Sequence, residues 1–242
     1  MNGKYVDVLA IAPHPDDVEM GCGGTMLKLR KMGYTTGIVD LTAGELGTRG
    51  TRKLRTEEAE NASKILGVSF RTNLDLGDGH LINNDSTRKA VVKTIRESRP
   101  QLILTSHWID DHPDHVQCGY LVKDAVYLAG LYNYLPEIEY HRTKGAAYFL
   151  GRDVPLSTIQ PMFLVDITDE FPQKMEAIKA YTSQIYQADP DTNEPETPLS
   201  HPEFLTIFET RGRFYGRMID CKYAEPFFIK YPPKIIDPVA IW

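Results

Sequence analysis

Short apolar runs alternate with amphipathic segments through the first half of the chain. The runs have the length and composition of buried strands, and they span 6–12, 35–42, 68–74 and 101–105. The amphipathic segments carry apolar residues at helical spacing, and they span 21–32, 51–66, 88–98 and 116–131. Four such alternations predict right-handed βαβ crossovers and a mostly parallel sheet with helices on both faces.

The second half of the chain has a less regular pattern. Further apolar runs predict strands over 146–150 and 162–167. Amphipathic spacing predicts helices over 168–184 and 204–218. The proline-rich tail from Pro226 yields no assignment.

Neither an internal repeat nor a linker interrupts the pattern, so we expect a single α/β domain over 1–242. In the common doubly wound order, the first and fourth strands lie side by side, and ligands bind in the crevice outside their carboxyl ends. A polar stretch with four prolines, 188–202, is typical of a surface loop or lid.

Histidines and aspartates are concentrated directly after the first and fourth predicted strands, in 12–17 (APHPDD) and 112–115 (HPDH). A catalytic metal site typically takes three ligands from His and Asp or Glu and leaves a position open for water. His14 and Asp17 are three positions apart, so a turn leading into a helix brings them to one side. One histidine of the second segment would complete a set that suits zinc first, with Fe²⁺ or another divalent metal as alternatives.

The other groups of these segments are candidates for catalysis. Asp16 adjoins the proposed ligand Asp17 but points elsewhere, which suits a general base that takes a proton from water. If His115 binds the metal, His112 faces the same cleft as an imidazolium that stabilises an oxyanion or protonates a leaving amine, with Asp114 as its charge partner. The reverse assignment, in which His112 is the ligand, stays open.

Composition narrows the class of partner. A net charge of −6 over 242 residues gives no footprint for nucleic acid or for an anionic membrane surface, so small-molecule chemistry is expected. The N-terminus lacks the pattern of a signal peptide, and no apolar run approaches the length of a membrane span. Three cysteines without CxxC spacing fit a reducing compartment, and we therefore expect a cytoplasmic protein.

Arginines follow the glycine-rich loop after the second predicted strand. Arg49, Arg52 and Arg55 lie at the same carboxyl edge of the sheet as the two His/Asp segments. Guanidinium groups at this edge would suit a carboxylate or phosphate on the substrate. For Arg49 and Arg52, the alternative is the solvated start of a helix.

The paired segments 12–17 and 112–115 resemble those of the PIG-L/LmbE family of zinc-dependent N-acetylglucosaminyl deacetylases. Three further stretches, 41–50, 54–59 and 65–68, are similar to the branch of bacillithiol-biosynthesis deacetylases, which act on N-acetylglucosaminyl-malate. The resemblance extends over most of the chain. It implies a Rossmann-like fold and often a homohexamer.

Carried over by position, the resemblance implies that three residues bind zinc: His14, Asp17 and His115. It implies that Asp16 is the general base and that His112 stabilises the tetrahedral intermediate and helps the amine to leave. Substrate contacts would come from Arg55, Gly44, Glu45 and Asp78.

The resemblance also concerns the C-terminal part, 168–242, which we expect to complete the pocket and the oligomer contacts. Part of the family swings a C-terminal tyrosine over the site. Phe204 falls at that position in this chain, and neither Tyr186 nor Tyr215 can be assigned the role from sequence.

We therefore hypothesise a metal-dependent hydrolase that removes the acetyl group of N-acetylglucosaminyl-malate, a small-molecule glycoside, with Asp16 as general base. Deacetylation of another N-acetylglucosaminide, or of an amide of a small thiol conjugate, would use the same chemistry. Outside hydrolases, a nucleotide-binding oxidoreductase lacks its glycine fingerprint here. A sugar-binding module without catalytic activity would not need Asp16 as a base or His112 as an oxyanion-stabilising group.

Overall fold

Seven strands form one mixed sheet in the computed structural model, which describes residues 5–151, 160–185 and 195–232. The strands are β1 (Val8–Ala12), β2 (Thr36–Asp40), β3 (Phe70–Asn73), β4 (Leu102–Ser106), β5 (Gly145–Phe149), β6 (Phe163–Asp166) and β7 (Ala224–Ile229). Their order in the sheet is β3-β2-β1-β4-β5-β7-β6. The first five are parallel, and β7 runs antiparallel to both of its neighbours. The predicted Rossmann-like, mostly parallel α/β sheet is confirmed.

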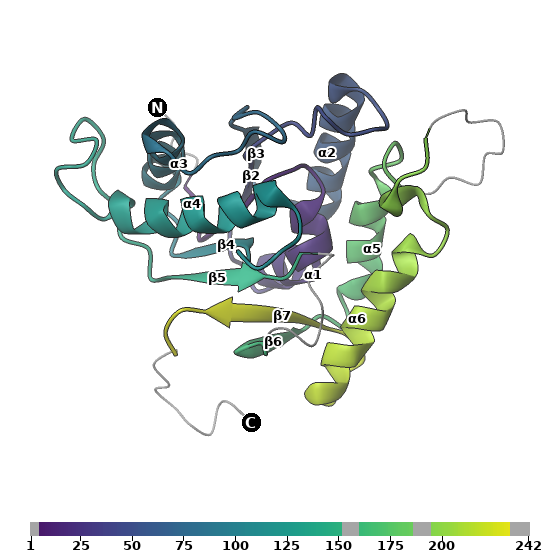
Figure 1. Ribbon diagram of the computed structural model, residues 1–242. Coiled ribbons are helices and arrows are strands. Elements are labelled where there is room, and N and C mark those ends of the chain that lie inside the picture. Colours follow the sequence, from purple (N-terminus) through teal and green to yellow (C-terminus); the bar gives the residue numbers. More distant parts are fainter. Residues whose placement is uncertain (1–4, 152–159, 186–194, 233–242) are drawn as a thin grey trace.

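Helices cover both faces of this sheet (Figure 1). They are α1 (Asp17–Lys31), α2 (Arg52–Leu66), α3 (Asp85–Ser98), α4 (Pro113–Ala129), α5 (Phe171–Lys179) and α6 (Phe204–Met218), with the 3-10 helix η1 (Pro198–Ser200) before α6. Among the described residues, no helix has both the length and the apolar character needed to cross a membrane.

The central strand β1 is buried along its whole length because both of its faces are covered. Leu9 and Ile11 pack in the core beneath α3 and α4. Val8, Ala10 and Ala12 point to the other face and pack against α1. This alternation leaves the carboxyl ends of β1 and β4, which are hydrogen-bonded neighbours, as the open edge for a ligand.

Two predicted helices differ most from the observed ones. The helix expected to begin at residue 21 begins at Asp17 and is interrupted at Cys22, whose φ of −144° is not helical. The helix expected to reach residue 184 ends at Lys179. Beyond it, Thr182 and Ser183 donate hydrogen bonds to the buried carboxylate of Glu58 on α2, which holds the chain in turns instead of a continued helix.

The strand β7 was not predicted, because Pro226 argues against a strand inside a sheet. Pro226 lies opposite Leu164 of β6, beyond the last residue at which β7 pairs with β5. The neighbouring Glu225 accepts hydrogen bonds from the backbone amides of Gly24 (2.9 Å) and Thr25 (2.7 Å). These amides directly follow the interruption of α1, so β7 supplies the acceptors that the helix lacks at this point.

Candidate metal and active site

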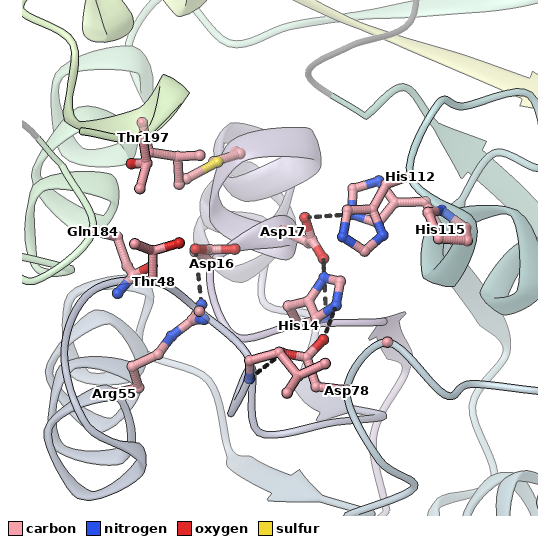
Figure 2. Close-up of a pocket in the computed structure, with 16 residues that line it drawn as sticks. His14, Asp16, Asp17, Thr48, Arg55, Asp78, His112, His115, Gln184 and Thr197 are labelled. Carbon is pink, nitrogen blue, oxygen red and sulfur yellow. Dashed lines mark hydrogen bonds and ion pairs between the residues drawn. The ribbon is translucent and has the colours of Figure 1, made fainter. Parts of the chain in front are cut away.

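Two loops meet at the carboxyl edge of the sheet, where β1 and β4 lie side by side (Figure 2). One loop leads from β1 into α1, and the other leads from β4 into α4. The structure therefore brings together all six predicted site residues of the two segments: His14, Asp16, Asp17, His112, Asp114 and His115.

His14, Asp17 and His115 form a compact group that could hold a metal ion. Nδ1 of His14 lies 3.2 Å from Oδ2 of Asp17, and Nε2 of His115 lies 3.3 Å from Oδ1 of Asp17. The ligand atoms of the three residues all lie within 4.8 Å of one another. Two imidazoles and one carboxylate, converging from two loops, fit a divalent ion that keeps open coordination positions.

The charges of this group also fit a cation. Burial lowers the pKa of His115, but the carboxylates of Asp17 and Asp110 outweigh this effect and raise the pKa to about 10. Burial likewise opposes protonation of His14, whose pKa is nevertheless raised well above the ordinary value by the nearby carboxylates. The carboxylates around these rings therefore favour positive charge at this position. A divalent ion bound by the two imidazoles and Asp17 would supply such charge.

Buried carboxylates contact both imidazoles at the ring nitrogen that does not face Asp17, and they fix the orientation of the rings. Nε2 of His14 lies 3.0 Å from Oδ1 of Asp78 and 3.3 Å from Oδ2 of Asp114. Nδ1 of His115 lies 2.9 Å from Oδ2 of Asp110. Carboxylates in this position hold a metal-binding imidazole in one tautomer and one orientation. Sequence reasoning missed Asp110, although its place five residues before His115 in the same loop is a usable signal.

We expect Asp110→Asn to weaken metal binding roughly 10- to 100-fold, because an amide holds the His115 ring less firmly than a carboxylate does. Metal affinity measured by competition with a chelator checks this. The matched control is Asp111→Asn, because Asp111 is the exposed neighbour of Asp110 and lies outside the cavity lining. Equal affinities in the two variants would contradict an orienting role for Asp110.

Asp16 lies beside this group without joining it. Its backbone has a φ of 110°, which is rare for a residue with a side chain, and the side chain is buried. Oδ2 of Asp16 accepts a hydrogen bond of 3.1 Å from Nη2 of Arg55. Burial raises the pKa of Asp16 to about 7 although Arg55 opposes the shift. A carboxyl group with a pKa near neutrality suits proton transfer at physiological pH.

His112 adopts a different protonation state from the predicted imidazolium. Its Nδ1 accepts the backbone N–H of Asp114 at 3.2 Å, as the N-cap of α4, so its ring proton must lie on Nε2. Burial lowers the pKa of His112, and the charges of His115 and His14 lower it further. The ring is therefore a neutral N–H donor in the cavity.

The predicted pairing of the Asp114 carboxylate with His112 is not what the structure shows. The carboxylate instead faces His14 and accepts hydrogen bonds from the backbone amides of Gly79 (2.7 Å) and Leu81 (3.3 Å). A second group that could hold a metal ion, His14 with His112 and Asp114, leaves the reverse ligand assignment geometrically possible.

A cavity of about 380 Å³ contains the proposed metal group. Its lining residues are His14, Asp16, Asp17, Met20, Leu46, Gly47, Thr48, Arg55, Asp78, Gly79, His112, Pro113, His115, Gln184, Thr197 and Leu199. Gln184, Thr197 and Leu199 come from the C-terminal part and were not predicted as site residues. They carry no motif, so only the fold brings them to the cavity.

The predicted substrate contacts divide into two sets. Arg55 and Asp78 line the cavity, but both already bind other site residues, Asp16 and His14 respectively. Gly44, Glu45 and Arg49 do not line it. Gly44 and Glu45 brace the loop instead.

Gly44 has a φ of +65° and its carbonyl accepts from Nη1 of Arg55 at 3.1 Å. A Cβ here would lie 2.1 Å from that nitrogen, so only glycine fits. The Glu45 carboxylate accepts the backbone amides of Ala43 (3.1 Å) and Asp78 (2.9 Å). Exposed Arg52 pairs with Asp75 at 2.8 Å.

In part of the family a C-terminal tyrosine covers the site. Of the candidates for this role in the described part of the chain, neither Phe204 nor Tyr215 lines the cavity. Phe204 and Tyr215 are buried in separate apolar clusters. Tyr186 lies outside the described residues, as does part of the predicted lid, 188–202.

Comparison with known proteins places the chain in a family. The profile of the PIG-L family, described as GlcNAc-PI de-N-acetylase, matches residues 9–126. The diacetylchitobiose deacetylase of Thermococcus kodakarensis is 32% identical, over 94% of this chain and 84% of that protein. The chain belongs to the PIG-L family. The predicted family is confirmed, and so is the predicted enzyme class, an N-deacetylase.

The chain is also similar to a further deacetylase and to a solved structure. The probable N-acetyl-alpha-D-glucosaminyl L-malate deacetylase 2 of Bacillus anthracis is 26% identical, over 73% of this chain and 80% of that protein. The conserved protein TT1542 from Thermus thermophilus is 35% identical, with a TM-score of 0.86, and the match covers 97% of this chain and 99% of that one.

Proposed function

We propose that this protein hydrolyses the N-acetyl group of a small N-acetylglucosaminyl conjugate, with N-acetylglucosaminyl-malate as the first candidate. One observation carries the proposal. The possible metal ligands His14, Asp17 and His115 line a single cavity of about 380 Å³. The carboxyl group of Asp16 and the imidazole of His112 line the same cavity. Amide hydrolysis needs these three functions at one carbonyl group.

His14, Asp17 and His115 would hold the metal ion, with zinc as the first candidate and Fe²⁺ or another divalent metal as alternatives. When bound, such an ion supplies Lewis-acid chemistry, which polarises a carbonyl group and lowers the pKa of water. Asp16 accepts a proton from the attacking water, and the departing amine takes up a proton as acetate is released. His112 offers Nε2–H to the oxygen that becomes negative during the attack.

The aglycone is the less constrained part of the proposal. Malate is supported by the three sequence stretches 41–50, 54–59 and 65–68 and by the relative from Bacillus anthracis. The expected anion site of Arg49 and Arg52 receives no support from the cavity, which neither residue lines. Diacetylchitobiose is therefore a second candidate, and the relative from Thermococcus kodakarensis favours it.

Acetate release from matched substrates tests the proposal. We expect the zinc-loaded protein to cleave N-acetylglucosaminyl-malate with the highest kcat/KM, ahead of diacetylchitobiose, N-acetylglucosaminyl-inositol and free N-acetylglucosamine. Metal-depleted protein is the control. Faster cleavage of diacetylchitobiose would reject malate and select the second candidate. No release from any glucosaminide, with the metal confirmed in the protein, would reject the whole proposal.

Three wider expectations stay predictions that rest on sequence and family resemblance. They are the cytoplasmic location, a homo-oligomer for which the resemblance suggests a hexamer, and the single domain over 1–242 whose C-terminal part completes the pocket and the oligomer contacts. The lining of the cavity by Gln184, Thr197 and Leu199 supports the last of them.

A further inference from the structure

On the side away from His14, Asp17 and His115, the cavity is lined by three neutral polar side chains and by the guanidinium of Arg55. Figure 2 shows Thr48, Gln184 and Thr197 on one side and His112 and His115 on the other. A substrate that has its acetyl group at His14, Asp17 and His115 and extends across the cavity would meet these side chains. Their polar atoms are therefore candidates for recognising the sugar.

A chain of hydrogen bonds fixes the orientation of the Gln184 amide. Ser183 Oγ lies 2.7 Å from Oε2 of the buried carboxylate of Glu58, which can only accept, so the hydroxyl donates its proton there. The same hydroxyl then accepts from Nε2 of Gln184 at 2.9 Å. Nε2 also donates to the carbonyl of Arg49 at 2.7 Å. Both partners of Nε2 are acceptors, so this atom must be the amide nitrogen.

The other end of the amide, Oε1, is the atom left for the cavity. Gln184 is largely buried and lines the cavity, while both of its N–H groups donate to Arg49 and Ser183. A Cβ built on Gly47, which also lines the cavity, would lie 3.7 Å from Oε1. Within the described ranges, Oε1 accepts no hydrogen bond from another residue. Gln184 therefore presents a fixed acceptor that cannot rotate to become a donor.

The anchor of this acceptor is rigid. Glu58 accepts from the hydroxyl of Thr182 at 2.9 Å and from the backbone amide of Ser183 at 2.6 Å, in addition to the hydroxyl of Ser183. Gly50 has a φ of +76°, and a Cβ there would lie 2.6 Å from Ser183 Oγ, so a glycine is needed for the loop to approach. Such support holds a recognition group in place before the substrate arrives.

We propose that Oε1 of Gln184 accepts a hydrogen bond from a ring hydroxyl of the sugar and is a specificity-determining group of this enzyme. This inference rests on the proposed function. It identifies a sugar hydroxyl as the part of the substrate that Gln184 recognises. When a substrate that lacks this ring hydroxyl binds, Oε1 of Gln184 has no hydrogen-bond donor, and binding is weaker.

The variant Gln184→Met tests the inference, because methionine has a similar size and no acceptor of comparable strength. Acetate release is measured with the best glucosaminide of the panel above and with N-cyclohexylacetamide, an acetamide on a six-membered ring without hydroxyl groups. We expect kcat/KM for the glucosaminide to fall about tenfold, mainly through KM, and kcat/KM for the hydroxyl-free amide to stay unchanged. Calorimetric binding of both compounds to metal-loaded Asp16→Asn protein, with and without Gln184→Met, gives the same comparison with little turnover.

Gln173→Met is the matched control. The amide of Gln173 also donates to a backbone carbonyl, that of Ile65 at 2.8 Å, but Gln173 lies outside the cavity lining. An equal loss for both substrates in Gln184→Met, or no loss beyond that of Gln173→Met, would overturn the inference. If the wild type neither cleaves nor binds any glucosaminide, the proposed function fails first. The two failures are therefore distinguishable.

Discussion

Asp16→Asn is expected to lower kcat for acetate release roughly 10²- to 10⁴-fold while the protein keeps its metal. The amide has the shape of the carboxyl group and can still accept from Arg55, but it cannot take a proton from water. The burial that raises the pKa of Asp16 to about 7 makes this residue an effective base near neutral pH. The measurement is kcat at substrate saturation, with metal content determined on the same sample.

Thermal unfolding of the variant supplies the control for Asp16→Asn. Asp16 has a positive φ and a buried contact with Arg55, so a change of Tm would reveal a structural effect. Loss of metal in proportion to the loss of activity would make Asp16 a ligand. Full activity would assign the base to another group. Either result contradicts the role proposed here.

His115→Ala is expected to abolish both metal binding and turnover, whereas His112→Ala should keep the metal and lose most of the turnover. His115 contributes Nε2 to the compact group with His14 and Asp17, and Asp110 orients its ring from behind. Removing one of three ligands leaves too few protein atoms to hold a divalent ion tightly. Removing His112 removes an N–H donor at the developing oxyanion, which costs roughly 10²- to 10³-fold in kcat.

The pair of variants decides between the two possible ligand sets. Metal content after dialysis is the first readout, and kcat of the metal-loaded sample is the second. Metal retained in His115→Ala and lost in His112→Ala would select the group of His14, His112 and Asp114 instead. Loss of metal from both variants would show that the two histidines act together as ligands.

The sequence pattern predicted the fold before residue 131, where the spacing of apolar residues along the chain indicates each strand and helix. Strand and helix periodicity gave the four alternations before residue 131, and the parallel order of β1 to β5 follows from them. Prediction weakened after residue 160 because contacts between distant segments decide that region. β7 forms despite Pro226, and α5 ends at Lys179 because Glu58 binds the turn that follows.

The candidate site divides in the same way. The sequence placed His14, Asp16 and Asp17 at the end of one strand and His112 and His115 at the end of its neighbour, and the structure brings these groups together. Their chemistry follows from residue type, because imidazole and carboxylate are the groups that bind divalent metals. No long-range information was needed beyond the strand order.

Only the tertiary structure decided how these groups are held and which neighbours they have. Asp78 reaches His14 across 64 positions, and Glu58 fixes Ser183, and through it Gln184, across 125 positions. The tautomer of His112 follows from its place as the N-cap of α4, which excludes the expected imidazolium. Hydrogen-bond partners and burial depend on segments far apart in the chain, whereas the sequence pattern reports only periodicity and residue type along it.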